Sequence, residues 1–358
     1  MVIGGGVMGA ATLHYLVELG CDAPLLVERE TLASGSTGHC AGGVRTLFSD
    51  ELNARIGLEA IARLERFPDE VGAELDLRLY GYLFLLDTPS DVGVFERALE
   101  LQQAIGVDTR FVDPLDFVAQ LETDDLLAAA FCPRAGYVTP DLVVQGYAQR
   151  AAARGATIVQ SCAASAIVVE GGRVVAVETP RGRVATDRVV LTAGVWSGAL
   201  AATAGLELPL EADGRHMFFT DTAPGFVEEV PLTIDFSTGF YFHREGSGLA
   251  VGGREQSLED LAPVATRRLP ALAELGFHSS FSGLYELSPD RNALVGTASS
   301  ADGLVYATGF SGHGFQQGPV IGEHLARLAL GLEPALDLAP FAVERFAHGA
   351  ARVEHGVV

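Results

Sequence analysis

Residues 1–28 read MVIGGGVMGAATLHYLVELGCDAPLLVE, and this stretch decides how the chain begins to fold. A short apolar start is followed by the spacing GxGxxG at Gly4, Gly6 and Gly9, then by a helical apolar pattern, and then by a short apolar strand that ends in Glu28. In this order the pattern predicts a βαβ unit. The glycines let backbone N–H groups at the helix start approach a pyrophosphate, and the acidic residue can accept hydrogen bonds from ribose hydroxyls. The sequence therefore predicts a dinucleotide-binding site. The alternative is a glycine-rich turn without a ligand, which the complete βαβ context disfavours.

The composition excludes several function classes. The 358 residues carry a net charge of −22, and all 24 basic residues are arginine because the chain has no lysine. Enzymes that need a Schiff-base lysine and nucleotide-binding loops of the GK[ST] type are therefore excluded. The acidic balance argues against nucleic-acid binding and against a polybasic membrane patch. No apolar run approaches the roughly 18 residues that a membrane span needs.

The cysteines bear on the cellular compartment of the protein, and the amino-acid composition bears on the kind of organism that encodes it. Four scattered cysteines lack the spacing of a metal site or a redox pair, which predicts reduced thiols, no metal centre and a cytoplasmic protein. The arginine- and alanine-rich usage is typical of GC-rich bacterial coding.

The segment over residues 29–48 bears on which dinucleotide binds. It is long and rich in glycine, and it follows directly after the acidic strand end. A nicotinamide-binding domain would usually pass quickly into another βα unit, whereas this chain is expected to run along its ligand. That difference favours FAD over NAD. A helix is expected to begin near Ser49 or Asp50.

Four ordered motifs resemble one known family. They are the glycine fingerprint, the stretch SGSTG at 34–38 with GGVR at 42–45, GLYELSPD at 283–290, and TGFSGHGFQQ at 308–317. Together they resemble the D-amino-acid oxidase (DAO) superfamily of FAD-dependent oxidoreductases. Within it, the branch with sarcosine oxidase β-subunits, proline dehydrogenases and glycine oxidases is the most similar. The resemblance runs from Val2 to about Leu330.

The resemblance implies an α/β plus α+β architecture of two interleaved domains. A Rossmann-like FAD-binding domain is expected over 1–75, 139–211 and 283–340. A substrate-binding domain with a mixed β-sheet is expected over 76–138 and 212–282, followed by a C-terminal tail over 341–358.

The same resemblance implies non-covalent FAD. Gly283 stands where monomeric sarcosine oxidases attach the flavin to a cysteine, so that linkage cannot form here. His39 and Cys40 lie in a flavin-proximal loop, but a bond to either is not expected. The loop over 309–318 is expected to precede a helix from Pro319, whose N-terminus would stabilise negative charge on the reduced flavin. The expected cofactor-binding residues are Gly4, Gly6, Val7, Met8, Gly9, Glu28, Arg29, Ser36, Thr37, Gly42, Gly43, Val44, Ala164, Ala193, Gly194, Trp196, Gly312, His313, Gly314, Phe315 and Gln316.

Members of this family oxidise the C–N bond of a small amino acid or amine to an imine, with hydride transfer to flavin N5. Tyr241 matches the tyrosine that binds the substrate carboxylate in glycine oxidases, and Tyr285 stands where those enzymes have the partner arginine. The candidate catalytic residues are Tyr241, Tyr285, His313 and Arg45, although His313 is not expected to act as a base. The other arginines that could bind a carboxylate are Arg215, Arg254 and Arg291.

The identity of the electron acceptor stays open at this point. A lysine beside the flavin promotes oxygen reduction in the family's oxidases, and this chain has Gln316 in the loop that carries a lysine there. The difference favours a dehydrogenase or a slow oxidase, with O2 or another carrier as acceptor. Two alternatives remain: a 2-hydroxy-acid dehydrogenase on the same fold, and a flavoprotein subunit that needs a partner chain. Both homo-oligomers and hetero-oligomers are compatible with the sequence.

Overall fold

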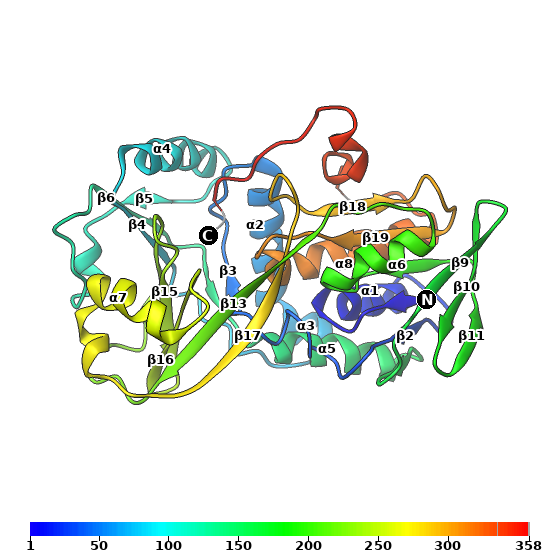
Figure 1. Ribbon diagram of the computed structural model, residues 1–358, viewed down its shortest axis with the longest axis horizontal. Coiled ribbons are helices and arrows are strands. Elements are labelled where there is room, and N and C mark those ends of the chain that lie inside the picture. Colours follow the sequence, from blue (N-terminus) through cyan, green and yellow to red (C-terminus); the bar gives the residue numbers. More distant parts are fainter. Residues whose placement is uncertain (335, 357–358) are drawn as a thin grey trace.

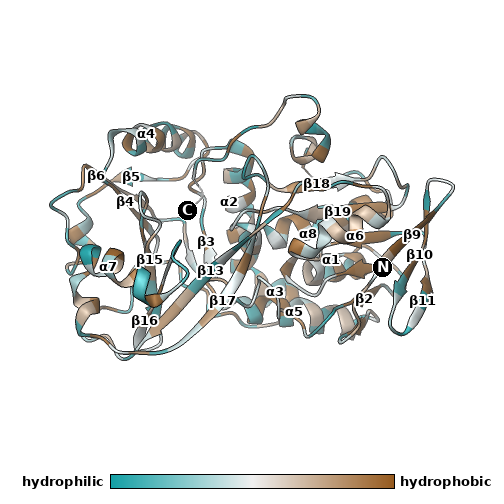
Figure 2. Cartoon of the chain, viewed as in Figure 1, coloured by the Kyte–Doolittle hydropathy of each residue, from teal (hydrophilic) through white to brown (hydrophobic). Residues whose placement is uncertain are grey.

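The computed structural model describes residues 1–334 and 336–356. It is an elongated molecule in which two large sheets lie side by side, and Figure 1 shows each sheet with its own covering helices. In Figure 2 apolar residues concentrate on the strands of both sheets, whereas the turns at the surface are more hydrophilic. In the described part of the chain, no helix combines the length and the apolar character needed to cross a bilayer.

The first sheet has six strands and contains the predicted βαβ unit. Strands β1 (Val2–Ile3) and β2 (Leu25–Val27) pair in parallel, and α1 (Val7–Glu18) connects them. Only the edge strand β18 is antiparallel to its neighbour. The strand order is β18 (Leu294–Thr297), β19 (Leu304–Thr308), β12 (Val189–Leu191), β1 (Val2–Ile3), β2 (Leu25–Val27) and β8 (Thr157–Val159).

Helix α1 is the centre of a helical layer on this sheet. It packs against α5 (Pro140–Ala153) and α8 (Gly314–Leu330), and α8 in turn packs against α2 (Glu51–Glu65). The backbone N–H groups of the first turn of α2 donate to the Asp50 carboxylate, which confirms the predicted start of that helix.

The expected start of the helix after the 309–318 loop is wrong. Helix α8 begins at Gly314, five residues before Pro319, which therefore lies inside the helix. The glycine-rich stretch suggested a loop, but Gly318 is a packing position, because a Cβ there would lie 2.6 Å from Val7 of α1. Gln317 of the same turn donates to the Asn53 side chain of α2 at 3.0 Å. Close helix packing and buried amide contacts thus extend the helix through residues that a loop would leave exposed.

A small three-stranded sheet covers one end of the molecule. Its order is β11 (Gly182–Ala185), β10 (Arg173–Thr179) and β9 (Ala166–Glu170), and helix α6 (Ser197–Thr203) packs on β9. Hairpin turns at Gly171–Gly172 and around Arg181–Gly182 connect its strands.

The second large sheet has eight strands and two different faces. One face packs under α7 (Leu258–Arg268), and part of the other packs against α4 (Pro89–Ala104). The strand order is β17 (Phe277–Leu287), β13 (Glu211–Thr220), β16 (Gly248–Gly253), β15 (Tyr241–Glu245), β14 (Leu232–Asp235), β4 (Tyr82–Leu86), β6 (Ala128–Cys132) and β5 (Arg110–Phe111).

Smaller elements join the two sheets. Strands β3 (Gly43–Val44) and β7 (Gly136–Tyr137) pair between them, and α3 (Phe67–Val71) follows α2. Each sheet collects strands from separate parts of the chain. The expected boundary at 211/212 falls at the first residue of β13, and the expected boundary at 282/283 falls inside β17. The exact division into domains stays a prediction.

Residues 341–356 fold back onto the helical layer. Arg345 forms a buried ion pair with Asp290 at 2.8 Å, and Glu354 accepts hydrogen bonds from Ser49 and Asn53 beside the start of α2. This segment was expected as a tail, and in the structure it is a packed part of the molecule.

Candidate active site

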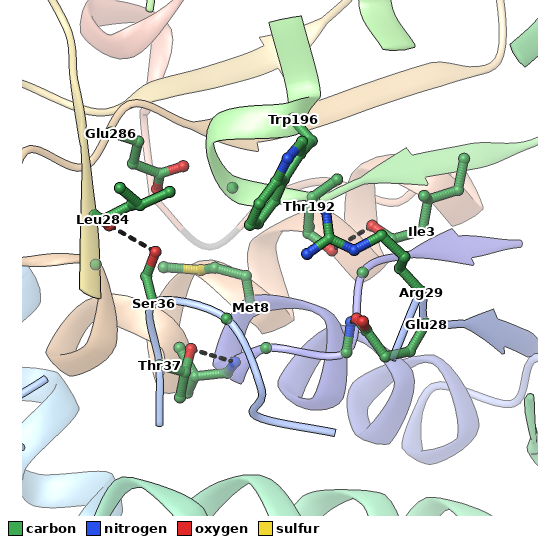
Figure 3. Close-up of a pocket in the computed structure, with 18 of the residues that line it drawn as sticks. Ile3, Met8, Glu28, Arg29, Ser36, Thr37, Thr192, Trp196, Leu284 and Glu286 are labelled. Carbon is green, nitrogen blue, oxygen red and sulfur yellow. Dashed lines mark hydrogen bonds between the residues drawn. The ribbon is translucent and has the colours of Figure 1, made fainter. Parts of the chain in front are cut away.

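One cavity of about 370 Å³ opens where β1, β2 and β12 end and where β17 passes over them. Figure 3 shows side chains from these elements directed toward a common space. Segments that lie far apart in the sequence form its wall: residues 3–8, 27–29, 34–40, 163–165, 192–200, 284–286 and 307–315. The cavity thus gathers parts of all four motifs.

Most of the predicted site residues line this cavity. They are Gly4, Gly6, Val7, Met8, Glu28, Arg29, Ser36, Thr37, Ala164, Ala193, Gly194, Trp196, Tyr285, Gly312, Gly314 and Phe315. The predicted residues that stand outside its wall are Gly9, Gly42, Gly43, Val44, Arg45, Tyr241, His313 and Gln316. Gly9 packs directly behind the wall residue Gly4. Only glycine fits at this position, since a Cβ there would lie 1.9 Å from the carbonyl oxygen of Gly4.

The first glycine turn forms a cradle of backbone donors. Helix α1 starts after Gly6, which has no side chain that could cap the helix. The N–H of Val7 points to the Thr37 hydroxyl at 3.2 Å, at the cavity wall. Uncapped N–H groups at a helix start, together with the positive end of the helix dipole, bind phosphate groups. The residues present therefore fit the pyrophosphate of a dinucleotide.

Glu28 is oriented by two backbone donors at the end of β2. Its Oε2 accepts from the N–H of Gly5 at 2.6 Å, and its Oε1 accepts from the N–H of Glu30 at 2.8 Å. These bonds hold the carboxylate at the cavity wall, where its remaining lone pairs can accept from ribose hydroxyls.

A cation–aromatic pair stands at the rim of this end. The guanidinium carbon of Arg29 lies 4.0 Å from the ring centroid of Trp196, whose side chain is 40% exposed (Figure 3). Stacked groups of this kind provide a flat apolar surface next to a bound base.

The face of the large sheet nearest the cavity carries tyrosines and one arginine. Cross-strand register places Tyr241, Met217, Arg215 and Tyr285 on this face, because Tyr241 and Met217 both pair with Gly252 and Asp213 pairs with Tyr285. Phe281 of the same face packs on the His39 ring at 5.4 Å, so the face is turned toward the 34–40 loop. The sheet therefore brings Tyr241 and Tyr285 to the same side.

Burial keeps these phenols protonated. Desolvation, followed by the neighbouring Tyr285, raises the pKa of Tyr241 well above its ordinary value. Desolvation also raises the pKa of Tyr285, although the charge of Arg215 acts in the opposite direction. At neutral pH both hydroxyls can donate hydrogen bonds, and neither can serve as a base.

The four candidate arginines differ sharply in their surroundings. Arg215 lies 5.0 Å from the Tyr285 ring centroid, its side chain is 18% exposed, and its Nε has no partner. Its guanidinium also pairs with Asp213 at 2.9 Å. Arg45 instead donates to the carbonyls of Leu47 and Gly356, so its charge is already used within the chain.

The other two candidate arginines, Arg254 and Arg291, have different surroundings. Arg254 is exposed and donates to the Ser237 carbonyl at 3.2 Å. Arg291 lies in a turn with a positive φ of 62°. Among the four, Arg215 alone has a guanidinium that lies against a tyrosine of the cavity wall.

His313 is buried and neutral. Burial lowers its pKa to about 4, with a smaller opposing effect from Glu354. Its ring packs against Phe48 at 5.5 Å, and neither ring nitrogen has a hydrogen-bond partner. The neighbouring Gln316 accepts from the N–H of Arg45 at 2.8 Å. These positions agree with the expectation that His313 is not a base.

Sequence reasoning missed several residues of the wall. Besides backbone and apolar contacts, the group includes one carboxylate, Glu286, next to Tyr285 on β17. The alternation of a strand could have drawn attention to it, since Leu284 and Glu286 must face the side opposite to Tyr285. The missed wall residues are Ile3, Gly5, Val27, Ser34, Gly35, Ala163, Ser165, Thr192, Ala199, Leu200, Leu284, Glu286, Ala307 and Phe310. His39 and Cys40, named only as neighbours of the flavin, also line it.

Comparison with known proteins identifies the family. Residues 1–328 match the family described as DAO, FAD dependent oxidoreductase. The chain belongs to the DAO family. FAD is therefore its cofactor, as predicted, and the cradle at α1 is the part of this family member that fits the pyrophosphate.

The chain is 28% identical over 379 residues to mitochondrial sarcosine dehydrogenase of Mus musculus. This match covers 97% of the chain and 41% of the mouse protein. It is 29% identical over 375 residues to 4-methylaminobutanoate oxidase (formaldehyde-forming) of Paenarthrobacter nicotinovorans, covering 97% of the chain and 45% of that oxidase. The chain thus spans less than half the length of these relatives.

Solved structures agree with the fold. L-proline dehydrogenase from P. horikoshii superposes with a TM-score of 0.89 at 27% identity, and 98% of each chain is covered. L-amino acid deaminase from Proteus vulgaris superposes with a TM-score of 0.85 at 23% identity, covering 96% of this chain and 93% of the deaminase, and shows the same fold. The predicted mixed α/β architecture of the DAO family is confirmed.

Proposed function

We propose that this chain oxidises the C–N bond of a small amino acid or a carboxylate-bearing amine to an imine, with FAD as the hydride acceptor. One observation carries the proposal: a single cavity joins the dinucleotide cradle at Gly4–Val7 to Tyr285, beside which Arg215 and Tyr241 share a sheet face. The similarity to a sarcosine dehydrogenase and an L-proline dehydrogenase supports the substrate class.

Bound FAD would supply the hydride acceptor, and the chain's own residues do the rest. Gly4–Val7, Thr37 and Glu28 bind the phosphates and the ribose. The uncapped N-terminus of α8, which borders the cavity at Gly312–Phe315, places a positive dipole end where negative charge develops. This assignment of α8 keeps the predicted role and moves its start to Gly314.

The substrate end is built for an anion. Arg215 provides a positive charge with an unpartnered Nε, and the protonated phenols of Tyr241 and Tyr285 provide neutral donors. A carboxylate held by an arginine and a tyrosine fixes the adjacent Cα–N unit at one distance from the flavin side of the cavity. Apolar rings, among them Phe310 and Phe315, exclude water from that side.

Several finer assignments belong to the same proposal. The chain has no lysine that could promote the reduction of oxygen, so only arginine, the helix dipole and neutral histidine could assist electron transfer to the acceptor. We therefore favour a dehydrogenase or a slow oxidase. Cysteines 21, 40, 132 and 162 are all unpaired, which supports a cytoplasmic location. The domain division over 1–75, 139–211 and 283–340 against 76–138 and 212–282 is part of the proposal as well.

Anaerobic bleaching of the flavin absorption tests the reaction. The purified protein is mixed with a panel of amino acids, N-methylated amino acids, matching amines without a carboxylate, and 2-hydroxy acids. Bleaching by carboxylate-bearing amines only is the expected result. Bleaching by hydroxy acids only would show the alternative C–O oxidation, and bleaching only after a partner chain is added would show a subunit that is incomplete by itself.

A further inference from the structure

A carboxyl group stands in the cofactor cavity without a cationic partner. Glu286 lies near the end of β17, and its side chain extends to the side of the strand opposite to Tyr285. Figure 3 shows its carboxyl directed away from β17, on the side of Trp196 and above Met8. Among the ion pairs of the described residues, none includes Glu286.

The hydrogen-bond geometry around Thr308 can accommodate a proton on this carboxyl. The Thr308 hydroxyl oxygen lies 2.8 Å from Glu286 Oε2 and 2.9 Å from the carbonyl oxygen of Gly194. A hydroxyl has one proton to donate, and a carbonyl can only accept. Both short contacts are satisfied together when Thr308 donates to Gly194 and a protonated Glu286 donates to Thr308.

The other carboxyl oxygen, Glu286 Oε1, accepts few hydrogen bonds that would stabilise a negative charge. Glu286 Oε1 accepts a long hydrogen bond, 3.5 Å from the N–H of Phe310, and the backbone N–H of Gly309 also acts on this carboxyl. Burial raises the pKa of this carboxyl to about 7, and the neighbouring Thr308 hydroxyl and the backbone N–H groups of Phe310 and Gly309 offset that effect only in part. The side chain is half-buried, and the surface that it keeps faces the cavity.

The charged neighbours do not change this conclusion. The elements that contact Glu286 present Thr308 from β19, Gly194 before α6 and Phe310 from the following loop, all of them uncharged. The other ionisable groups that line the cavity are Glu28, Arg29, His39, Cys40 and Tyr285. A cofactor that fills this space displaces water from Glu286 and adds the two negative charges of its pyrophosphate, and both effects disfavour a second anion.

We propose that Glu286 holds a proton in the FAD-bound protein, so that FAD binding takes up this proton from solvent. The carboxylate of the free protein and one solvent proton become a carboxylic acid, and no bond of the cofactor changes. The inference concerns cofactor binding alone. It holds or fails independently of the substrate that the enzyme oxidises.

The test is the pH dependence of FAD affinity, measured with the full chain after reversible removal of FAD. FAD itself does not titrate between pH 6 and 8.5. With a carboxyl that ionises near pH 7 in the free protein, affinity should fall about 30-fold over this range. Calorimetry in buffers of different ionisation enthalpy should find about half a proton taken up per FAD at pH 7.

The E286Q variant gives an expectation opposite to that of an ordinary binding residue. Its amide N–H₂ can donate to Thr308 as the carboxylic acid does, so the variant should bind FAD with little pH dependence. At pH 8.5 it should bind about 30-fold more tightly than the wild-type chain. His39 is another ionisable side chain of the cavity wall, so H39Q is the matched control, and it should keep most of the wild-type slope.

Three results would overturn the proposal. They are a flat wild-type profile with no proton uptake, an E286Q variant that binds FAD more weakly at every pH, and an H39Q variant that removes the slope. If E286Q does not fold, the wild-type holoenzyme still decides the matter. Its infrared spectrum must then show a protonated carboxylic-acid stretch that is absent from the FAD-free protein at pH 8.5.

Discussion

Replacing Arg215 by methionine should separate substrate binding from the chemical step. Methionine keeps much of the length and apolar surface of the arginine stem and removes the guanidinium. A charge-assisted hydrogen bond contributes about 1.5–3 kcal/mol, which corresponds to roughly 10- to 150-fold in affinity. Arg215 is 18% exposed and shares its charge with Asp213 at 2.9 Å, so the lower part of that range applies. We expect the KM for a carboxylate-bearing amine to rise about 10- to 30-fold.

The assay is steady-state turnover with an artificial electron acceptor, together with anaerobic flavin reduction in the stopped-flow. A purely anchoring role leaves the limiting rate of flavin reduction within about threefold, because the lost interaction is made equally in the ground state and the transition state. An amine of the same size without a carboxylate should react equally with both proteins.

Arg254→Met is the matched control, because it removes the same charge from an exposed arginine that donates only to the Ser237 carbonyl. It should leave the KM unchanged. Equal effects of the two substitutions would show a general electrostatic contribution. An unchanged KM in Arg215→Met, with intact flavin binding, would refute Arg215 as the anchor.

Three further outcomes are expected. Gly312→Ala should lower flavin binding or flavin reduction by at least tenfold, since Gly312 has a φ of +92° and a Cβ there would lie 2.4 Å from the Tyr285 ring; near-normal titration and kinetics would contradict this. Asp290→Asn should lower the free energy of unfolding by about 3 kcal/mol in urea at pH 7, because it leaves the buried Arg345 charge unpaired, whereas a loss below 1 kcal/mol would count against it. Burial acts to raise the pKa of Asp290, but Arg345 lowers it below its ordinary value, so this stabilisation is complete at neutral pH and should be lost as the pH falls below about 3.9. Acid precipitation should release free FAD, because Gly283 cannot form the cysteinyl link, and flavin retained on the protein would contradict non-covalent binding.

The cofactor half of the site could be read from the chain because its signals are local. The turn GGGVMG, the strand end at Glu28 and the glycine-rich loop after it each depend on residues that are close in sequence. Backbone approach to a phosphate requires glycine at fixed spacing, so the requirement leaves a visible pattern. These residues line the cavity as expected, apart from Gly9 and residues 42–44, which lie outside the cavity wall and are closely packed.

The substrate half depended on pairing between distant strands. Arg215 was one of several equivalent arginines in the sequence, and only the register of β13 with β17 places it against Tyr285. Arg45 was equally plausible, but the carbonyls of Leu47 and Gly356 occupy its guanidinium. No local pattern contains this information, because Gly356 lies 311 residues from Arg45 in the sequence, and Tyr285 lies on a different strand from Arg215.

The sequence by itself determined the βαβ unit, the dinucleotide cradle, the absence of any lysine chemistry and the family, since each of these follows from short-range spacing or from composition. Only the tertiary structure decided where α8 begins, which arginine faces the tyrosines, and that Glu286 enters the cavity without a cationic partner. The physical reason is common to all three. Helix extension, free charge and the proton of a buried carboxyl are set by burial and by long-range contacts, which exist only once the two sheets and the helical layer are packed together.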